Sequence, residues 1–211
     1  MRTPFRGWPA AAVDFLEQIE IENTKAFWTA HKTVYEAKVR APMEALLTEL
    51  AHEYGEGHIM RPHRDIRFSA DKSPYKTFIA AHNDVAYISL SARALGIGTG
   101  LYMPTASQLV RYRAAVAADD TGIELTVLVR TLRAKGIEMS AHDVLKTSPR
   151  GYAGDHPRIE LLRLKGVTAW REWPVGAWLE KAGAKRRVEQ FLQDTTELRG
   201  WIERHVGVDD G

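Results

Sequence analysis

The chain has 211 residues, of which 45% are hydrophobic and 27% are charged, a composition typical of a globular protein that can bury a sizeable core. Its formal net charge is only +2, which excludes a bulk polyanion binder of the histone kind. It has no cysteine, which excludes disulfides, thiolate chemistry and cysteine-based metal sites. The N-terminus has no apolar core of a signal peptide, and no run of about 18 apolar residues occurs, so we expect a cytoplasmic protein without membrane contact.

The N-terminal third has the spacing of helices. Apolar residues on one face predict a short helix over residues 8–20 and a much longer one that begins at Asn23 as its N-cap and ends at Gly55. Pro42 lies inside the longer pattern. Because proline lacks an N–H and clashes with the preceding turn, it must kink or divide that helix.

The middle third has the residues of strands. Asn83-Asp84 is typical of a hairpin turn, and Ile66 and Phe68 are spaced by two in a fourth candidate strand. The expected strands cover residues 75–82, 85–91, 94–103 and 64–69. Their short connections predict antiparallel pairing.

The last third is mainly helical. Thr105 and Gln108 have capping-box spacing and open a helix that runs to about residue 118. The remaining expected elements are a helix over 121–135, a loop over 146–156, a helix that opens at Pro157, a strand over 167–173, and helices over 175–180 and 185–205.

This order of helices, strands and helices predicts an α+β fold, with an antiparallel β-sheet in the middle third packed against N-terminal and C-terminal helices. No repeat or clear linker interrupts it. We therefore expect a single domain over residues 1–211, helical over 8–55, strand-rich over 63–103 and mainly helical over 105–205.

Positive charge is concentrated in two segments. Residues 1–60 carry six Lys and Arg against nine Asp and Glu, whereas residues 61–76 carry five against two. Residues 146–171 carry six against two. If the two basic segments meet in space, they form a local positive field on a nearly neutral protein.

The first basic segment contains a turn with two interpretations. Asp71 can accept from the backbone N–H two residues on, and Pro74 fixes φ, so the segment is typical of an Asx turn before a strand. The same turn would present Lys72, Ser73 and Tyr75, together with Lys76, as donors for a phosphate or carboxylate. Both interpretations can hold together.

The second basic segment, residues 146–157, offers Arg150, Tyr152 and His156. Asp155 and Pro157 are typical of a helix start. The free N–H groups of such a start could receive an anion.

The sequence lacks the motifs of dinucleotide-binding, kinase and metal sites. The glycines of Gly96-Ile-Gly98-Thr-Gly100 lack the dinucleotide fingerprint, because position 101 is leucine and the run continues as a strand. His63-Arg64-Asp65 resembles a kinase catalytic loop but has Ala70 where that loop needs asparagine. The histidines have no metal-ligand spacing. We expect no cofactor and no metal.

The charged motif has a family resemblance. Arg64-Asp65-x-Arg67-Phe68-Ser69-x-Asp71-Lys72-Ser73-Pro74-Tyr75-Lys76 resembles the signature of the bacterial and fungal domain-of-unknown-function family 2461. The similarity extends to Tyr102-Met103-Pro104, Pro149-Arg150-Gly151-Tyr152, Asp155-His156-Pro157 and Leu161-Leu162-Arg163. It is collinear over most of the chain, from about Phe5 to Trp201, with Gly7-Trp8-Pro9 where relatives often carry Gly-Phe-Pro. The resemblance implies one domain and no established activity.

Three functions remain open. The first is a site for a small anionic ligand, with cations that neutralise it and with Tyr75, Tyr152 and His156 to orient it or exchange protons. The candidate ligand-binding residues are Arg64, Asp65, Arg67, Lys72, Ser73, Tyr75, Lys76, Arg150, Tyr152 and His156. The second is a structural lattice of Arg–Asp ion pairs with a protein-interaction role. The third, nucleic-acid binding through a basic patch, is disfavoured by the near-neutral net charge. Catalytic residues and oligomeric state are left open.

Overall fold

The computed structural model describes residues 4–67 and 70–207, and the chain divides into two compact units. Unit 1 consists of Met1–Ile97 and Glu172–Gln190, and unit 2 consists of Gly98–Arg171 and Phe191–Gly211. Each unit is described by itself. A single domain over the whole chain stays a prediction.

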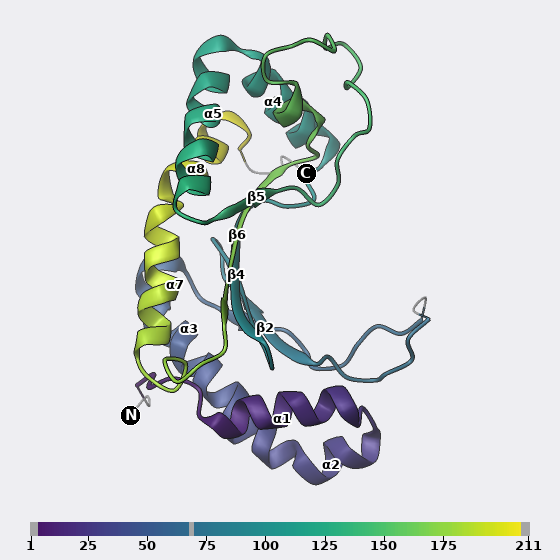
Figure 1. Ribbon diagram of the computed structural model, residues 1–211, viewed down its shortest axis with the longest axis vertical. Coiled ribbons are helices and arrows are strands. Elements are labelled where there is room, and N and C mark those ends of the chain that lie inside the picture. Colours follow the sequence, from purple (N-terminus) through teal and green to yellow (C-terminus); the bar gives the residue numbers. More distant parts are fainter. Residues whose placement is uncertain (1–3, 68–69, 208–211) are drawn as a thin grey trace. The chain divides into compact units, whose positions relative to one another are not determined.

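The described residues form an α+β fold, as predicted (Figure 1). The elements of the first half are α1 (Ala10–Ile21), α2 (Lys25–Val34), the π-helix η1 (Tyr35–Arg40), α3 (Ala41–Tyr54), β1 (His58–Ile59), β2 (Phe78–His82), β3 (Tyr87–Ser91) and β4 (Ala94–Leu101). Those of the second half are α4 (Ala106–Ala117), α5 (Asp119–Ala134), β5 (Glu138–Ser140), α6 (Ile159–Arg163), β6 (Val167–Pro174), α7 (Gly183–Asp194) and α8 (Thr196–His205). Strands β4 and β6 and helix α7 contribute residues to both units.

The described strands form a sheet in the order β1-β2-β3-β4-β6-β5. In unit 1, β1 pairs antiparallel with β2, and β2 pairs antiparallel with β3. In unit 2, β5 pairs antiparallel with β6. The sequence missed β1 and β5, because strands of two and three residues are too short to show alternation.

The turn between β2 and β3 is longer than predicted. His82 pairs with Tyr87, so four residues rather than Asn83-Asp84 alone connect the strands. The side-chain oxygen of Asn83 accepts from the N–H groups of Val85 and Ala86, at 3.1 and 2.8 Å. An asparagine that satisfies two turn amides stabilises a wider loop, which explains the later start of β3.

The long helix expected from Asn23 to Gly55 is divided. Its N-cap is Thr24, whose hydroxyl accepts from the N–H of Phe27, so the prediction of Asn23 as N-cap was wrong. The chain passes from α2 through the π-helix before Pro42 enters the first turn of α3. A wider turn is one way to accommodate a proline that cannot donate to the preceding turn.

The fourth strand predicted over residues 64–69 was wrong. Residues 64–67 have no strand structure, and Phe68 and Ser69 lie outside the described residues. Strand β2 begins at Phe78, three residues later than expected. The charged side chains here bond to one another and to nearby backbone.

Three C-terminal predictions also need correction. Residues 175–180 form turns rather than a helix, and the helix expected at Pro157 begins only at Ile159. The helix expected over 185–205 is divided at Thr195, whose buried hydroxyl donates to the carbonyl of Phe191. The capping box of Thr105 and Gln108 is confirmed.

Unit 1 has its core between the helices and one face of the strands. Helices α1 to α3 lie on one side of these strands (Figure 1), and the buried residues Ile79, Ala81, Ile88 and Leu90 share one face of β2 and β3. An aromatic cluster joins α1 to α2, since the Phe15 ring lies 6.1 Å from the Trp28 ring. The Trp28 ring of this cluster also stacks on Tyr75, a residue of the candidate site.

Unit 2 has its own core around Tyr112 and Trp201, whose rings meet edge to face at 6.2 Å. The Tyr112 hydroxyl donates to the carbonyl of Leu161, and burial raises the pKa of this phenol. The glycine-containing strand also has a packing role, because a Cβ on Gly98 would lie 2.5 Å from the Trp170 ring. Among the described residues, each helix is too short or too polar to cross a lipid bilayer.

Candidate functional site

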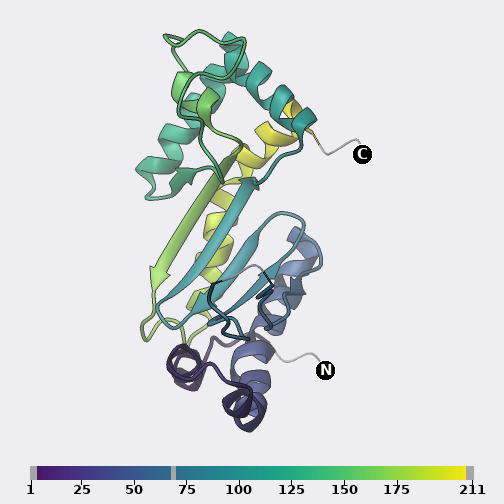
Figure 2. The same cartoon turned by 90° about the vertical axis from the view of Figure 1, so that its right-hand side faces the viewer.

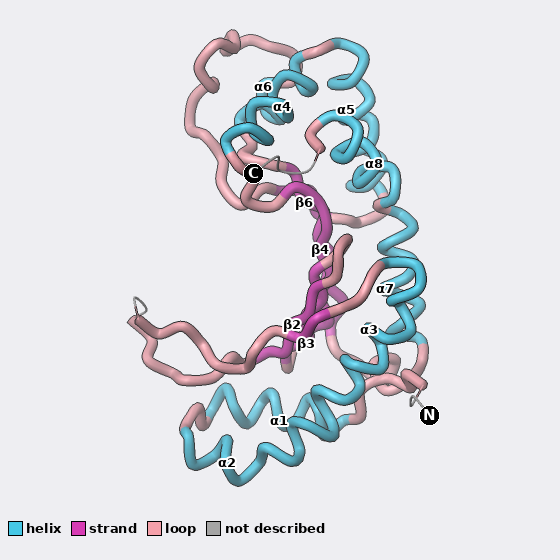
Figure 3. The backbone as a smooth tube through the Cα atoms, turned by 180° about the vertical axis from the view of Figure 1, so that it is seen from behind, coloured by secondary structure: helices cyan, strands magenta, loops and turns pink. Residues whose placement is uncertain are grey.

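The first basic segment forms a two-stranded ribbon in the long loop between β1 and β2 (Figure 3). His63 and Tyr75 form an antiparallel bridge. The N–H of Arg64 donates to the carbonyl of Pro74 at 2.9 Å, and the N–H of Lys76 donates to the carbonyl of Pro62 at 2.8 Å. The ribbon is thus a paired structure that carries the charged turn at its far end.

Tyr75 anchors the ribbon to the helices of unit 1. Its N–H donates to the side-chain oxygen of Asn23 at 3.0 Å, and its carbonyl accepts from the Asn23 amide at 2.9 Å. Its ring stacks on Trp28 with centroids 4.4 Å apart, and His63 lies 5.0 Å away. Only 5% of Tyr75 is exposed. A buried ring with both backbone groups satisfied is a strong structural anchor.

The ribbon leaves the sheet at a bulge. The N–H of Met60 donates to the carbonyl of Ala80, while the next pair along joins Pro62 to Lys76. Arg61 alone therefore lies opposite residues 77–79. Such an insertion bends a strand and re-aims its side chains.

Two of the ribbon's arginines pair with carboxylates of the same loop. Arg67 contacts Asp65 with both Nε and Nη2, at 2.9 and 2.6 Å. Arg64 pairs with Asp71 through Nη1. Both pairs are exposed Arg–Asp pairs, the kind of contact that the ion-pair lattice expected from the sequence would contain.

The turn at Asp71 is an Asx turn, as expected. One oxygen of Asp71 accepts from the N–H and the hydroxyl of Ser73, at 2.9 and 2.6 Å. These bonds, together with Arg64, hold the pKa of Asp71 far below its ordinary value. Lys72 donates to the carbonyl of Ile66 at 3.0 Å. Most of the predicted ligand donors are thus engaged within the loop.

Two cations differ from the rest. Within the described part of the chain, the side chains of Arg61 and Lys76 have neither a carboxylate within ion-pair distance nor a hydrogen-bond acceptor, whereas Arg64, Arg67 and Lys72 each have one. Burial, and then the neighbouring Arg61, lowers the pKa of Lys76. The Lys76 ammonium also lies 5.9 Å from the centre of the Phe78 ring. The excess of positive charge is therefore larger at the base of the ribbon, with two cations and no carboxylate, than at its tip, with three cations and two carboxylates.

Arg150, Tyr152 and His156 belong to unit 2, whereas the ribbon belongs to unit 1. The N–H of Tyr152 donates to the carbonyl of Pro149, and Nδ1 of His156 accepts from the N–H of Arg158 at 3.0 Å. Helix α6 has only five residues. The helix start that was predicted to bind an anion is therefore a turn. One of its N–H groups, that of Arg158, already donates to the His156 ring.

Two arginines just beyond the second basic segment, Arg158 and Arg163, bond the backbone of unit 2. Arg158 is 9% exposed and donates to the carbonyls of Val116 and Ala117 and to Asp119, at 2.7, 2.8 and 2.9 Å. Arg163 donates to the carbonyl of Leu145 at 2.8 Å. Neither arginine was among the candidate ligand-binding residues, but the sequence did not predict their structural role, because their acceptors are mainly backbone carbonyls that carry no sequence signal.

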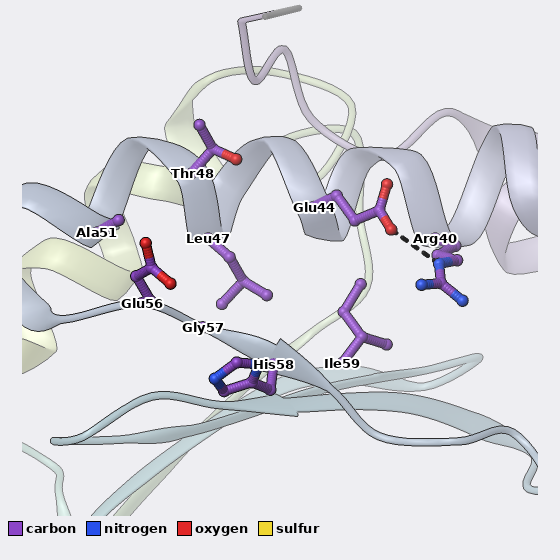
Figure 4. A pocket seen from close by; sticks show the side chains of 9 residues that line it. All are labelled: Arg40, Glu44, Leu47, Thr48, Ala51, Glu56, Gly57, His58 and Ile59. Carbon is purple, nitrogen blue, oxygen red and sulfur yellow. Dashed lines mark hydrogen bonds and ion pairs between the residues drawn. The ribbon is translucent and has the colours of Figure 1, made fainter.

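Unit 1 also has a pocket that the sequence did not predict. Its volume is about 520 Å³, and it lies between α3 and the chain that enters β1 (Figure 4). It is lined by Arg40, Glu44, Leu47, Thr48, Ala51, Glu56, Gly57, His58 and Ile59. The one available signal was Gly57, where a Cβ would lie 2.5 Å from the Leu47 side chain. The described residues contain no cluster of three His, Cys, Asp or Glu able to hold a metal ion.

Comparisons with known proteins give a family and no function. Neither the curated proteins nor the solved structures yielded a match. Residues 11–201 match the family described as conserved hypothetical protein (DUF2461). This match covers most of the chain and includes the ribbon, the pocket and the second basic segment. The chain therefore belongs to this family.

Proposed function

We propose that the protein binds a small anion, a phosphate or carboxylate group, at the base of the ribbon, where Arg61 and Lys76 receive it. The observation that supports this is the pair of neighbouring cations to which no described carboxylate is matched. Elsewhere in the ribbon each arginine has its own aspartate. An anion between Arg61 and Lys76 would relieve their repulsion and form charge-assisted hydrogen bonds.

Of the candidate ligand-binding residues expected from the sequence, the proposed site uses only Lys76. Arg64, Arg67 and Lys72 already have acceptors, and an anion that recruited them would have to displace Asp71, Asp65 or a carbonyl. Asp65 and Ser73 act as partners within the loop. Tyr75 holds the ribbon in place through its buried ring. Arg150, Tyr152 and His156 stay a separate prediction in unit 2, as does the cytoplasmic location.

The ion-pair lattice stays the alternative. The pairs Arg64–Asp71 and Arg67–Asp65 favour it for the tip of the ribbon. They leave Arg61 and Lys76 without an explanation.

The test is a titration of the ¹⁵N-labelled chain with sodium phosphate, and separately with sodium acetate, at constant ionic strength. We expect saturable shifts at the amides of Arg61 and Lys76. Lys76→Gln and Arg61→Gln should each weaken binding by about fivefold or more. Lys32→Gln, at an exposed position of α2, is the matched control and should change nothing. Equal binding by all variants, or binding lost only in Arg64→Gln, would contradict the site.

A further inference from the structure

Among the strands that the structure describes, β1 has an unpaired edge. It pairs with β2 on one side and is the first strand in the order of the sheet. The N–H of Met60 donates to the carbonyl of Ala80, so Met60–Ala80 and His58–His82 are the hydrogen-bonded pairs and Ile59–Ala81 lies between them. The N–H and carbonyl of Ile59 therefore point away from β2, toward the open edge.

Helix α3 packs on the strands of unit 1 (Figure 2), and Figure 4 shows the space between α3 and β1. This groove is the pocket of about 520 Å³ described above. At one end Gly57 brings the chain into contact with Leu47. Leu47 and Ile59 project into the space between helix and strand (Figure 4).

The charged side chains that line the groove are mostly acidic. The only arginine in the lining, Arg40, already pairs with Glu44 at 2.8 Å and with Glu36 at 3.6 Å. Glu56, at the other end, has no cationic partner among the residues described here. The lining thus has acidic groups in excess and suits a basic ligand group.

We propose that this groove binds an extended peptide, which adds to the edge of β1 and directs a Lys or Arg side chain at Glu56. The peptide residue opposite Ile59 would donate to its carbonyl and accept from its N–H, as a neighbouring strand does. Apolar side chains of the peptide would lie on Leu47 and Ile59. Backbone bonds provide the affinity in this mode of recognition, and the pockets along the groove provide the selectivity.

The site is independent of the anion site. The proposed anion ligands are side chains of the ribbon, whereas the peptide needs a backbone edge and carboxylates. Failure of either proposal leaves the other untouched.

The experiment titrates the ¹⁵N-labelled full chain with the peptide acetyl-Val-Thr-Val-Thr-Lys-amide, whose central Val lies opposite Ile59 and whose Lys, on the same face, lies opposite Gly57 and beside Glu56 in an antiparallel register. We expect saturable shifts at the amides of Gly57 and Ile59. Ile59→Pro removes only an outward N–H, since Ile59 lies in a pair that makes no ladder bonds, and should weaken binding about tenfold relative to Ile59→Ala. Glu56→Gln should weaken binding about threefold and reduce its salt dependence.

A second experiment keeps the wild-type protein and changes the peptide. A peptide N-methylated at its central residue cannot donate to Ile59, and a peptide with Glu in place of Lys meets like charge; both should bind about tenfold more weakly. Equal binding of all peptides would overturn the proposal. So would a dimer that Ile59→Pro dissociates, because a second copy of the chain would then occupy the edge.

Discussion

The two basic segments have similar compositions but use their cations differently. In the ribbon, Arg64 and Arg67 pair with aspartates a few residues away, and both pairs stay exposed. In unit 2, Arg158 is buried and donates mainly to backbone carbonyls at the end of α4. A buried arginine on carbonyls stabilises the unit that surrounds it, whereas an exposed pair orders only its own loop. Density of positive charge alone therefore does not identify a binding site; the partners do.

The largest effect should come from Arg158→Ala. It would leave the carbonyls of Val116 and Ala117 unsatisfied, and Gly122 packs directly on the arginine side chain. We expect a loss of about 3 kcal/mol in the free energy of unfolding, measured by urea denaturation. Arg150→Ala, an exposed change in the same segment, is the control and should stay within about 0.5 kcal/mol. Equal losses of unfolding free energy in the two variants would contradict the distinction between a buried arginine bonded to carbonyls and an exposed one.

The next effect should come from Asn23→Ala. It would remove both side-chain bonds that hold the N–H and carbonyl of Tyr75. We expect a loss of about 2 kcal/mol. Hydrogen exchange at the amide of Tyr75 should rise with it. Unchanged exchange would mean that Trp28 alone holds the ribbon.

A smaller and local effect should come from Asp71→Asn. The pKa of Asp71 is lowered by Ser73 and Arg64, so its ordering of the turn is fully present above the ordinary value of 3.8 and is lost as the pH falls through the lower, folded-state pKa. We expect faster amide exchange over residues 70–74 in the variant, with little change in global unfolding. A carboxyl ¹³C signal of Asp71 that titrates at its ordinary pKa would contradict this.

The smallest effect on stability should come from Lys76→Gln. The pKa of Lys76 is lowered, so the folded state disfavours its charge, and wild-type stability should rise with pH between the folded-state pKa and the ordinary value of 10.5. At neutral pH the variant should be as stable as wild type, within about 0.5 kcal/mol. Thermal unfolding from pH 7 to 10.5 measures this. A strongly destabilised variant would make Lys76 a structural residue.

Much of the fold could be predicted from the sequence, because its signals are local. The capping box at Thr105 and the dividing effect of Pro42 depend on residues within one or two turns. Asn23 shows where this fails. Asparagine suits an N-cap, but here its side chain bonds a backbone 52 residues away, and Thr24 takes over the cap.

The candidate site was predictable only in part. The Asx turn at Asp71 followed from spacing, since its partners lie two and seven residues away. Arg61 and Lys76 could not be separated from the other cations, because the acceptors that engage Arg64, Arg67 and Lys72 are known only from the folded loop. Strand β1 has only two residues, too few to show a strand pattern in the sequence, so its open edge could not be predicted.

The most direct test of the anion site is the pKa of Lys76 itself. It can be followed by the ¹³Cε signal of the labelled lysine as the pH rises, with and without phosphate. We predict a pKa below 10.5 in the free protein, and a rise when phosphate binds, because the bound anion favours the charged ammonium. A pKa that saturating phosphate leaves unchanged would contradict the proposed function.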